Sequence, residues 1–159
     1  MRQTLYEQIK LKTEGRRKSK NWYRSQLFSS LDPIDGYPQV GRMYFFSYGA
    51  KFGDELEYWD RYPLVYVTSV SYATGHFTGG NLHYVRPVLR VTLGKMFQSG
   101  TEDYPPRMHH KYIIDNTSGL FSVPEPEWGD IGKLPVEEFV TNVNGKYMTL
   151  PSSFVWSRP

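Results

Sequence analysis

Pro63-Leu-Val-Tyr-Val-Thr-Ser-Val-Ser-Tyr72 is the clearest β-strand of the chain, because β-branched and aromatic residues suit a pleated surface. Its apolar side chains alternate between Val65 and Val67 on one face and Leu64, Tyr66 and Val70 on the other. Both faces therefore carry large apolar groups, and the strand is predicted to be buried on two sides. A small, strongly bent antiparallel sheet or SH3-like barrel covered by short helices meets that requirement, so the predicted fold class is α+β.

Further strands are expected on both sides of this run. Met43-Tyr-Phe-Phe-Ser-Tyr48 precedes it, and His76-Phe-Thr78 and Asn81-Leu-His-Tyr-Val85 follow it. The pair Gly79-Gly80 between the last two indicates a bulge or a tight bend. Later in the chain, short strands are expected at 120–123 and 131–134.

Helices are predicted in four places. Residues 2–14 form the first, and a second begins after Ser19 as N-cap and ends before Asp32-Pro33. A third begins at Pro87, with Leu89, Leu93 and Phe97 spaced four apart, although a strand over 88–93 stays open. After Tyr104-Pro-Pro106, a short helix is expected to point Met108, Tyr112 and Ile113 inward.

The charge is distributed unevenly. Residues 1–24 hold 8 of the 19 Lys and Arg residues against Glu7 and Glu14, a balance of +6, whereas the remaining 135 residues carry 11 basic and 14 acidic groups, a balance of −3. We therefore divide the chain into a basic helical N-terminal arm (1–31), a β-rich core domain (32–140) and an extended C-terminal tail (141–159). A cationic arm on an acidic body indicates what kinds of partner the protein can bind and says nothing about the fold.

Several classes of protein are disfavoured by composition. The chain has no cysteine, which excludes disulfides and thiolate metal sites. No apolar run resembles a signal peptide or is long enough to span a bilayer, so synthesis in the cytoplasm and no membrane partner are expected.

No catalytic, cofactor-binding or metal-binding residue is predicted, and neither is a small-molecule substrate. His109-His110 with Asp115, and His76 with His83, lack the three or four convergent ligands of a closed metal site. The acidic loop with Asp54, Glu55 and Glu57 has no His near it in sequence, and a solvated surface is the usual role of such a charge run. The chain is therefore predicted not to be an enzyme.

The string Tyr58-Trp-Asp-Arg-Tyr-Pro-Leu64 has two interpretations. In one, Trp59 and Tyr62 form a stacking surface and Arg61 clamps a phosphate or a carboxylate. In the favoured one, Asp60 and Arg61 satisfy backbone groups at the start of the strand while the rings pack on the sheet.

Partner contacts are predicted at both ends of the chain. The basic cluster beside aromatic residues suits either phosphates and bases or an acidic protein surface, and protein docking is the favoured alternative. The apolar tail is expected to pack on its own body or on a neighbour. The predicted contact residues are Arg16, Arg17, Lys18, Lys20, Trp22, Tyr23, Arg24, Tyr147, Phe154 and Trp156.

A series of motifs over residues 20–140 resembles a family of small proteins of tailed bacteriophages, especially contractile-tailed ones. The motifs are Trp22-Tyr-Arg24, Gly41-Arg-Met-Tyr-Phe-Phe-Ser-Tyr48, Leu56-Glu-Tyr-Trp-Asp-Arg-Tyr-Pro-Leu-Val65, Gly79-Gly-Asn-Leu-His-Tyr-Val85 and Glu127-Trp-Gly-Asp-Ile131 with Leu134-Pro-Val-Glu-Glu-Phe139. After the first strand this chain has Gly49-Ala-Lys-Phe-Gly53 where the family has an Asp-Pro-Lys type of turn. The resemblance implies a virion or virion-assembly context.

Two functional hypotheses follow. The leading one is a structural subunit of a phage particle, in the tail, baseplate or neck, that forms a hetero-oligomeric assembly with other virion proteins through its arms. The alternative is a nucleic-acid-binding phage protein that acts at DNA ends or during packaging. The leading hypothesis rests on one physical premise, that neighbouring subunits must cover the apolar residues at the two ends of the chain.

Overall fold

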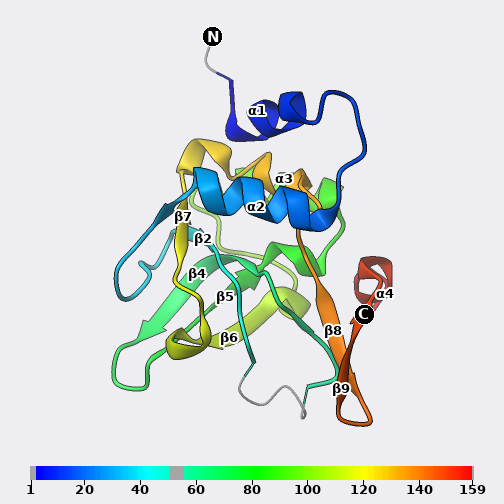
Figure 1. The fold of residues 1–159 in the computed structure, drawn as a ribbon. Coiled ribbons are helices and arrows are strands. Elements are labelled where there is room, and N and C mark those ends of the chain that lie inside the picture. Colours follow the sequence, from blue (N-terminus) through cyan, green and yellow to red (C-terminus); the bar gives the residue numbers. More distant parts are fainter. Residues whose placement is uncertain (1–2, 51–55, 159) are drawn as a thin grey trace.

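The fold consists of two antiparallel sheets with helices packed against them (Figure 1). The computed structural model describes residues 3–50 and 56–158. The α-helices are α1 (Leu5–Lys12), α2 (Lys20–Ser30), α3 (Pro87–Gln98) and α4 (Ser152–Trp156). The strands are β1 (Asp32–Pro33), β2 (Met43–Phe45), β3 (Trp59–Asp60), β4 (Leu64–Ser71), β5 (His76–Asn81), β6 (His109–Ile113), β7 (Phe121–Val123), β8 (Phe139–Val143) and β9 (Lys146–Leu150).

The larger sheet has the strand order β1-β7-β2-β4-β5-β6, and the smaller one has the order β3-β8-β9. The predicted α+β class and antiparallel sheet are confirmed, whereas the described strands close no barrel. The loop with Asp54 and Glu55, including most of the turn at 49–53, lies outside the described residues.

Strand β4 lies at the centre of the larger sheet, between β2 and β5. Its first four residues are buried, as expected for a strand covered on both faces. The register to β5 shifts between Val67 and Ser69. Because this bulge changes the alternation, Val70 packs beside Val65 and Val67 and not beside Tyr66 as predicted.

Two apolar cores lie on opposite faces of this sheet. Alternate residues such as Met43, Phe45, Leu64 and Tyr66 belong to the larger core, which extends to the helices. Their neighbours Tyr44, Phe46, Val65 and Val67 belong to a smaller aromatic core that also contains Phe77, Tyr112 and Leu120. Side chains alternate between the two faces of a strand. Every second residue of β2 and β4 therefore lies in the larger core, and the residues between them lie in the smaller one.

The helix termini follow from capping residues in the sequence. Ser19 Oγ accepts a hydrogen bond from Trp22 N at 3.1 Å, which confirms Ser19 as the N-cap of α2. Pro87 occupies the first position of α3 and confirms the helix over the open strand alternative. Helix α2 packs on the larger core through Tyr23 and Leu27.

Gly79 and Gly80 lie within β5, and Leu82–Tyr84 form a 3₁₀ turn where a strand was expected. Two further local predictions are wrong. The segment after Tyr104-Pro-Pro106 forms a single 3₁₀ turn and then β6, which pairs with β5 as an edge strand. Residues Ile131–Lys133 form a 3₁₀ turn packed on α3 and not a strand. In both segments the secondary structure is decided by contact with an element distant in sequence, β5 for one and α3 for the other. A short apolar run does not reveal such a contact.

Both ends of the chain fold onto the body. Asn144 and Gly145 have φ values of 53° and 83° and form the turn of the β8–β9 hairpin. Helix α4 follows, with Val155 buried and Trp156 Nε1 donating to His83 O at 3.0 Å. At the other end, Ile9 of α1 is fully buried in the larger core. Part of the apolar surface that was expected to need neighbouring subunits is thus covered within the chain itself, whereas Tyr147, Met148 and Phe154 stay exposed.

Helix α3 crosses the segment 128–132 at close range, and Gly94 makes this approach possible. A Cβ atom on Gly94 would lie 2.0 Å from Trp128 O, where the backbone has no room to move. We expect Gly94→Ala to lower the free energy of unfolding by about 3 kcal/mol, the upper range for overpacking, and Tm by about 10 °C in thermal denaturation. Gly49→Ala is the matched control, since nothing lies within 4 Å of a Cβ there, and equal losses in both variants would contradict the packing argument.

Candidate nucleic-acid interface

The most basic part of the chain is the turn that joins α1 to α2. We call residues 10–20 the basic segment; its six cations are accompanied by one acid, Glu14, a balance of +5. The cations are Lys10, Lys12, Arg16, Arg17, Lys18 and Lys20. Glu14 and Gly15 take left-handed φ values of 53° and 72°, and they lie in the connection between α1 and α2 (Figure 1).

Most of these cations make no ion pair. The side chains of Lys10, Lys12, Arg16 and Arg17 are exposed and have no hydrogen-bond or ion-pair partner within the described ranges. Lys18 lies over the ring of Trp22, with Nζ 5.4 Å from its centroid. Because no carboxylate of the described residues pairs with these four cations, their charge is available to an external anion.

The basic segment is held on a firm support. Ile9 anchors α1 in the larger core, and Leu5 N donates to Glu127 Oε2 at 2.9 Å. Lys133 Nζ lies 4.9 Å from the ring centroid of Tyr6. At the other end, Lys20 Nζ donates to Glu137 O at 3.1 Å and to Ser152 Oγ at 3.2 Å. The cations are therefore presented by an ordered surface.

The predicted contact residues fall into three groups. Arg16, Arg17 and Lys20 are exposed on the basic segment, with Lys18 and Trp22 half-buried beside them. Tyr23 and Arg24 are buried and face the body of the protein. Tyr147 and Phe154 are exposed and Trp156 is half-buried. These three residues lie on the C-terminal segment, which Lys20 contacts by donating a hydrogen bond to Ser152. Partner contacts by these residues stay predictions.

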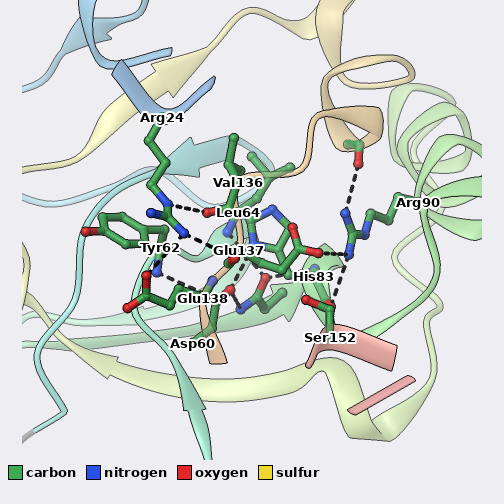
Figure 2. Close-up of polar contacts among 12 residues, drawn as sticks. Arg24, Asp60, Tyr62, Leu64, His83, Arg90, Val136, Glu137, Glu138 and Ser152 are labelled. Atoms are coloured by element: carbon green, nitrogen blue, oxygen red, sulfur yellow. Dashed lines mark hydrogen bonds and ion pairs between the residues drawn. The ribbon is translucent and has the colours of Figure 1, made fainter. Parts of the chain in front are cut away.

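Arg24 has a structural role that its sequence context did not reveal. Its Nε donates to Val136 O at 2.7 Å, its Nη2 lies 3.3 Å from Glu138 Oε2, and its guanidinium stacks over the ring of Tyr62 (Figure 2). These contacts fix α2 to the start of β8, and through α2 they fix the end of the basic segment.

A network of buried charged and polar groups lies beneath this contact (Figure 2). Asp60 Oδ1 accepts from the backbone N–H groups of Tyr62 and Glu138, at 3.0 and 3.2 Å. Its Oδ2 accepts from Asn81 Nδ2 at 3.0 Å and lies 2.8 Å from His83 Nδ1. The structural interpretation of Asp60 is thus confirmed, because its oxygens satisfy backbone groups.

Arg90 and Glu137 form the other half of the network. Arg90 is fully buried; its Nη2 lies 3.3 Å from Glu137 Oε1, and its remaining donors bond the carbonyls of Val85, Gly132 and His83. Sequence reasoning missed both residues. A signal was present for Arg90, because it shares one helix face with Leu93 and Phe97, which follow it by three and seven residues.

Ionisation of Glu137 is favoured inside this network. Burial by itself raises the pKa of this carboxyl, but attraction by His83, Arg90 and Lys20 outweighs burial and lowers the pKa to about 2. Burial lowers the pKa of Arg90, which nevertheless stays charged because an arginine titrates far above neutral pH. The pair is therefore ionised at neutral pH.

This shift predicts a dependence of stability on pH. Because the folded pKa lies below the ordinary value, the stabilisation by Glu137 is complete above pH 4.5 and is lost as the pH falls toward 2. Over this pH range we expect the free energy of unfolding of the wild type to fall by about 3 kcal/mol more than that of Glu137→Gln. Urea denaturation at several pH values measures it, and parallel curves for the two proteins would contradict the assignment.

The four histidines each have another contact. His83 lies beside Asp60, His76 Nδ1 beside Thr74 Oγ1, His109 Nδ1 2.7 Å from Tyr104 Oη, and His110 Nε2 2.9 Å from Arg107 O. Burial lowers the pKa of His110. Within residues 3–50 and 56–158, no group of three or more His, Cys, Asp or Glu side chains is arranged to hold a metal ion.

The fold and the basic segment define an α+β protein with an ordered, uncompensated cationic surface. Comparison with protein families identifies it further: the chain belongs to the family described as phage T4 terminal DNA protecting protein, whose model matches residues 1–102. No curated protein and no solved structure matches the chain. The resemblance to phage proteins is confirmed.

Family membership corrects the leading hypothesis. A structural subunit of the tail, baseplate or neck is wrong, because the family is defined by protection of terminal DNA. The premise of that hypothesis also fails for Ile9, Leu27 and Val155, which are buried within the chain. The alternative, a nucleic-acid-binding phage protein acting at DNA ends, is the one that the family supports.

The matched segment is not a separate folding unit. It ends just after α3, yet β7 lies between β1 and β2 in the larger sheet, and β1 pairs with β7 alone among the described strands. Glu137 and Val136 complete the contacts of Arg24 and Arg90. The residues after 102 are therefore needed to form the support of the basic segment.

Proposed function

We propose that this phage protein binds the ends of double-stranded DNA through its basic segment and protects them by covering them. The observation that carries the proposal is the set of four exposed cations without an ion-pair partner in the described ranges, presented by an ordered surface in a chain of the terminal DNA protecting family. Phosphates are the anions that such a surface attracts most strongly, because each contact releases counterions from the DNA.

In this proposal the protein acts by binding DNA and not by catalysis. Asp60 of the buried network already bonds to the backbone of Tyr62 and Glu138 and to His83, and both Asp60 and His83 are buried. Protection then requires only that a bound protein keeps nucleases from the terminus.

A salt titration tests the phosphate contacts. If the four free cations each neutralise one phosphate, the logarithm of the binding constant should fall with the logarithm of salt concentration with a slope of about −4. A slope near zero, or no binding of linear duplex at low salt, would overturn the proposal.

A competition experiment tests the preference for ends. Labelled linear duplex is bound first, and unlabelled DNA is added at equal nucleotide concentration, either as short duplexes or as covalently closed circles. Short duplexes should displace the label, and closed circles should compete weakly. Equal competition by both would show binding without preference for ends.

We also propose that the protein reaches the host with the DNA inside the virion, after synthesis in the host cytoplasm. No helix within the described ranges has the length and apolar character needed to cross a membrane. Contacts with other virion proteins through the exposed Tyr147 and Phe154 are part of this proposal. Immunodetection of the protein in purified particles tests it, and absence from intact particles would refute it.

A further inference from the structure

A polar hollow lies beside the buried network, at Arg61 and Tyr62. Three segments form its walls: 47–49 after β2, 61–62 before β4, and 115–118 before β7. Hydrogen bonds join the walls, with Ser47 N donating to Ser118 Oγ at 3.2 Å, Ser118 N to Ser47 O at 3.0 Å, and Tyr48 N to Arg61 O at 2.8 Å. The hollow is therefore preformed.

Its polar lining is rich in donors. Arg61 uses Nη1 for Glu138 Oε1 at 2.9 Å, and its side chain is 39% exposed, which leaves the rest of the guanidinium for a ligand. The hydroxyls of Ser47 and Tyr62 have no hydrogen-bond partner within the described ranges. A guanidinium fork with hydroxyl donors around it is the usual arrangement for binding an oxyanion.

The charge of the surroundings also favours an anion at Arg61. Glu138 is shared by two guanidinium groups, those of Arg24 and Arg61, at 3.3 and 2.9 Å. Two cations thus share one carboxylate, so Glu138 alone does not fully neutralise Arg61. Asp115, exposed at the hollow, is the opposing acid of its lining.

The hollow is linked to the basic segment through α2. Arg24 follows Lys20 by four residues on this helix, so both side chains lie on one face of it. Lys20 contacts Glu137, and Arg24 contacts Glu138, which in turn contacts Arg61. Helix α2 therefore connects the hollow to the end of the basic segment through a chain of ion pairs.

We propose that this hollow binds the terminal phosphate monoester of the DNA end, an inference that rests on the proposed function. A monoester carries a charge between −1 and −2 at neutral pH and presents three free oxygens, whereas an internal phosphodiester carries one negative charge and is flanked by two sugars. A hollow with one fixed guanidinium and separate hydroxyl donors discriminates between them, and so distinguishes an end from the interior of a duplex.

The test compares blunt duplexes of one sequence that carry a 5′-phosphate, a 3′-phosphate or hydroxyls only. We expect the wild type to bind one phosphorylated form about 10-fold more tightly than the hydroxyl form, as one charge-assisted contact gives. Arg61→Gln should lose this preference while still binding hydroxyl duplex. Asp115→Asn should increase it, because the opposing charge is removed.

Lys111→Gln serves as the control for removal of a surface cation, since Lys111 is exposed on the edge strand β6. The preference for a terminal phosphate should fall in Arg61→Gln and rise in Asp115→Asn. Asp115 is exposed, so its replacement should not disturb folding, and the second variant tests the proposal even if Arg61→Gln folds poorly. Inorganic phosphate and a mononucleotide are included as competitors, and neither should abolish the preference at concentrations equal to the DNA.

The outcomes separate the two proposals. Binding of hydroxyl duplex without any effect of a terminal phosphate would overturn the role of the hollow and leave end binding by the basic segment intact. Equal displacement by inorganic phosphate would assign the hollow to the free ion and overturn it as well. Failure to bind any duplex would overturn both.

Discussion

Replacing Lys12, Arg16 and Arg17 together by glutamine should weaken binding of linear duplex DNA about 100-fold at 0.15 M salt. Removing one cation that neutralises a phosphate lowers the salt slope by nearly one unit, which at this concentration corresponds to somewhat less than a tenfold change in affinity. The slope should therefore fall by about 3. The fold should be unaffected, because none of the three side chains makes an ion pair in the described part of the chain.

The matched control removes the same net charge elsewhere. Lys95 on α3, Lys111 on β6 and Lys146 on β9 are all exposed, and their combined replacement by glutamine should change the affinity only slightly. Fluorescence anisotropy with a labelled duplex over a salt series measures both variants. If the two triple variants lose equal affinity, binding follows net charge alone and the basic segment has no special role.

Arg90→Met should be among the most destabilising single substitutions in this protein. Removing one partner of a buried ion pair typically costs about 3–5 kcal/mol, because Glu137 would remain buried without its guanidinium. Three backbone carbonyls that now accept from Arg90 would also lose their donor. Thermal denaturation should show Tm lower by about 10 °C or more.

Arg86→Met is the control for this substitution. Arg86 precedes the same helix but is exposed and forms no side-chain cap, so its replacement should change the free energy of unfolding by less than about 0.5 kcal/mol. A similar small change for Arg90→Met would mean that the buried network contributes little to stability. In that case Glu137 would also fail to produce the predicted loss of stability at acid pH.

The sequence was sufficient for the elements whose signals are local. Ser19 supplies a hydroxyl for the first turn of α2, Pro87 has the φ value of a first helical residue, and the β-branched run at 64–71 suits only a buried strand. The Asn144-Gly145 turn was also predictable, because few residue pairs take left-handed φ values in succession. The concentration of positive charge in residues 1–24 likewise required only a count.

The candidate site was predictable only in part. Arg16, Arg17, Lys18 and Lys20 were identified as contact residues, but Arg24, close to them in sequence, turned inward toward Glu138. Which cations are free and which are paired depends on the carboxylates that the fold brings near. Glu138 is more than a hundred residues from Arg24, so no sequence window contains both.

Residues of the chain by themselves thus determined the helix ends, the central strand, the hairpin turn and the basic character of the N-terminal region, since each depends on backbone preferences or charges within a few positions. Only the tertiary structure showed that 109–113 is an edge strand and that both ends of the chain pack on the rest of the same molecule. It also showed that a buried network contains Asp60, His83, Arg90 and Glu137. The physical reason is that burial and pairing are properties of contacts between distant segments, and the free energy of those contacts exceeds the small local preferences that a sequence pattern records.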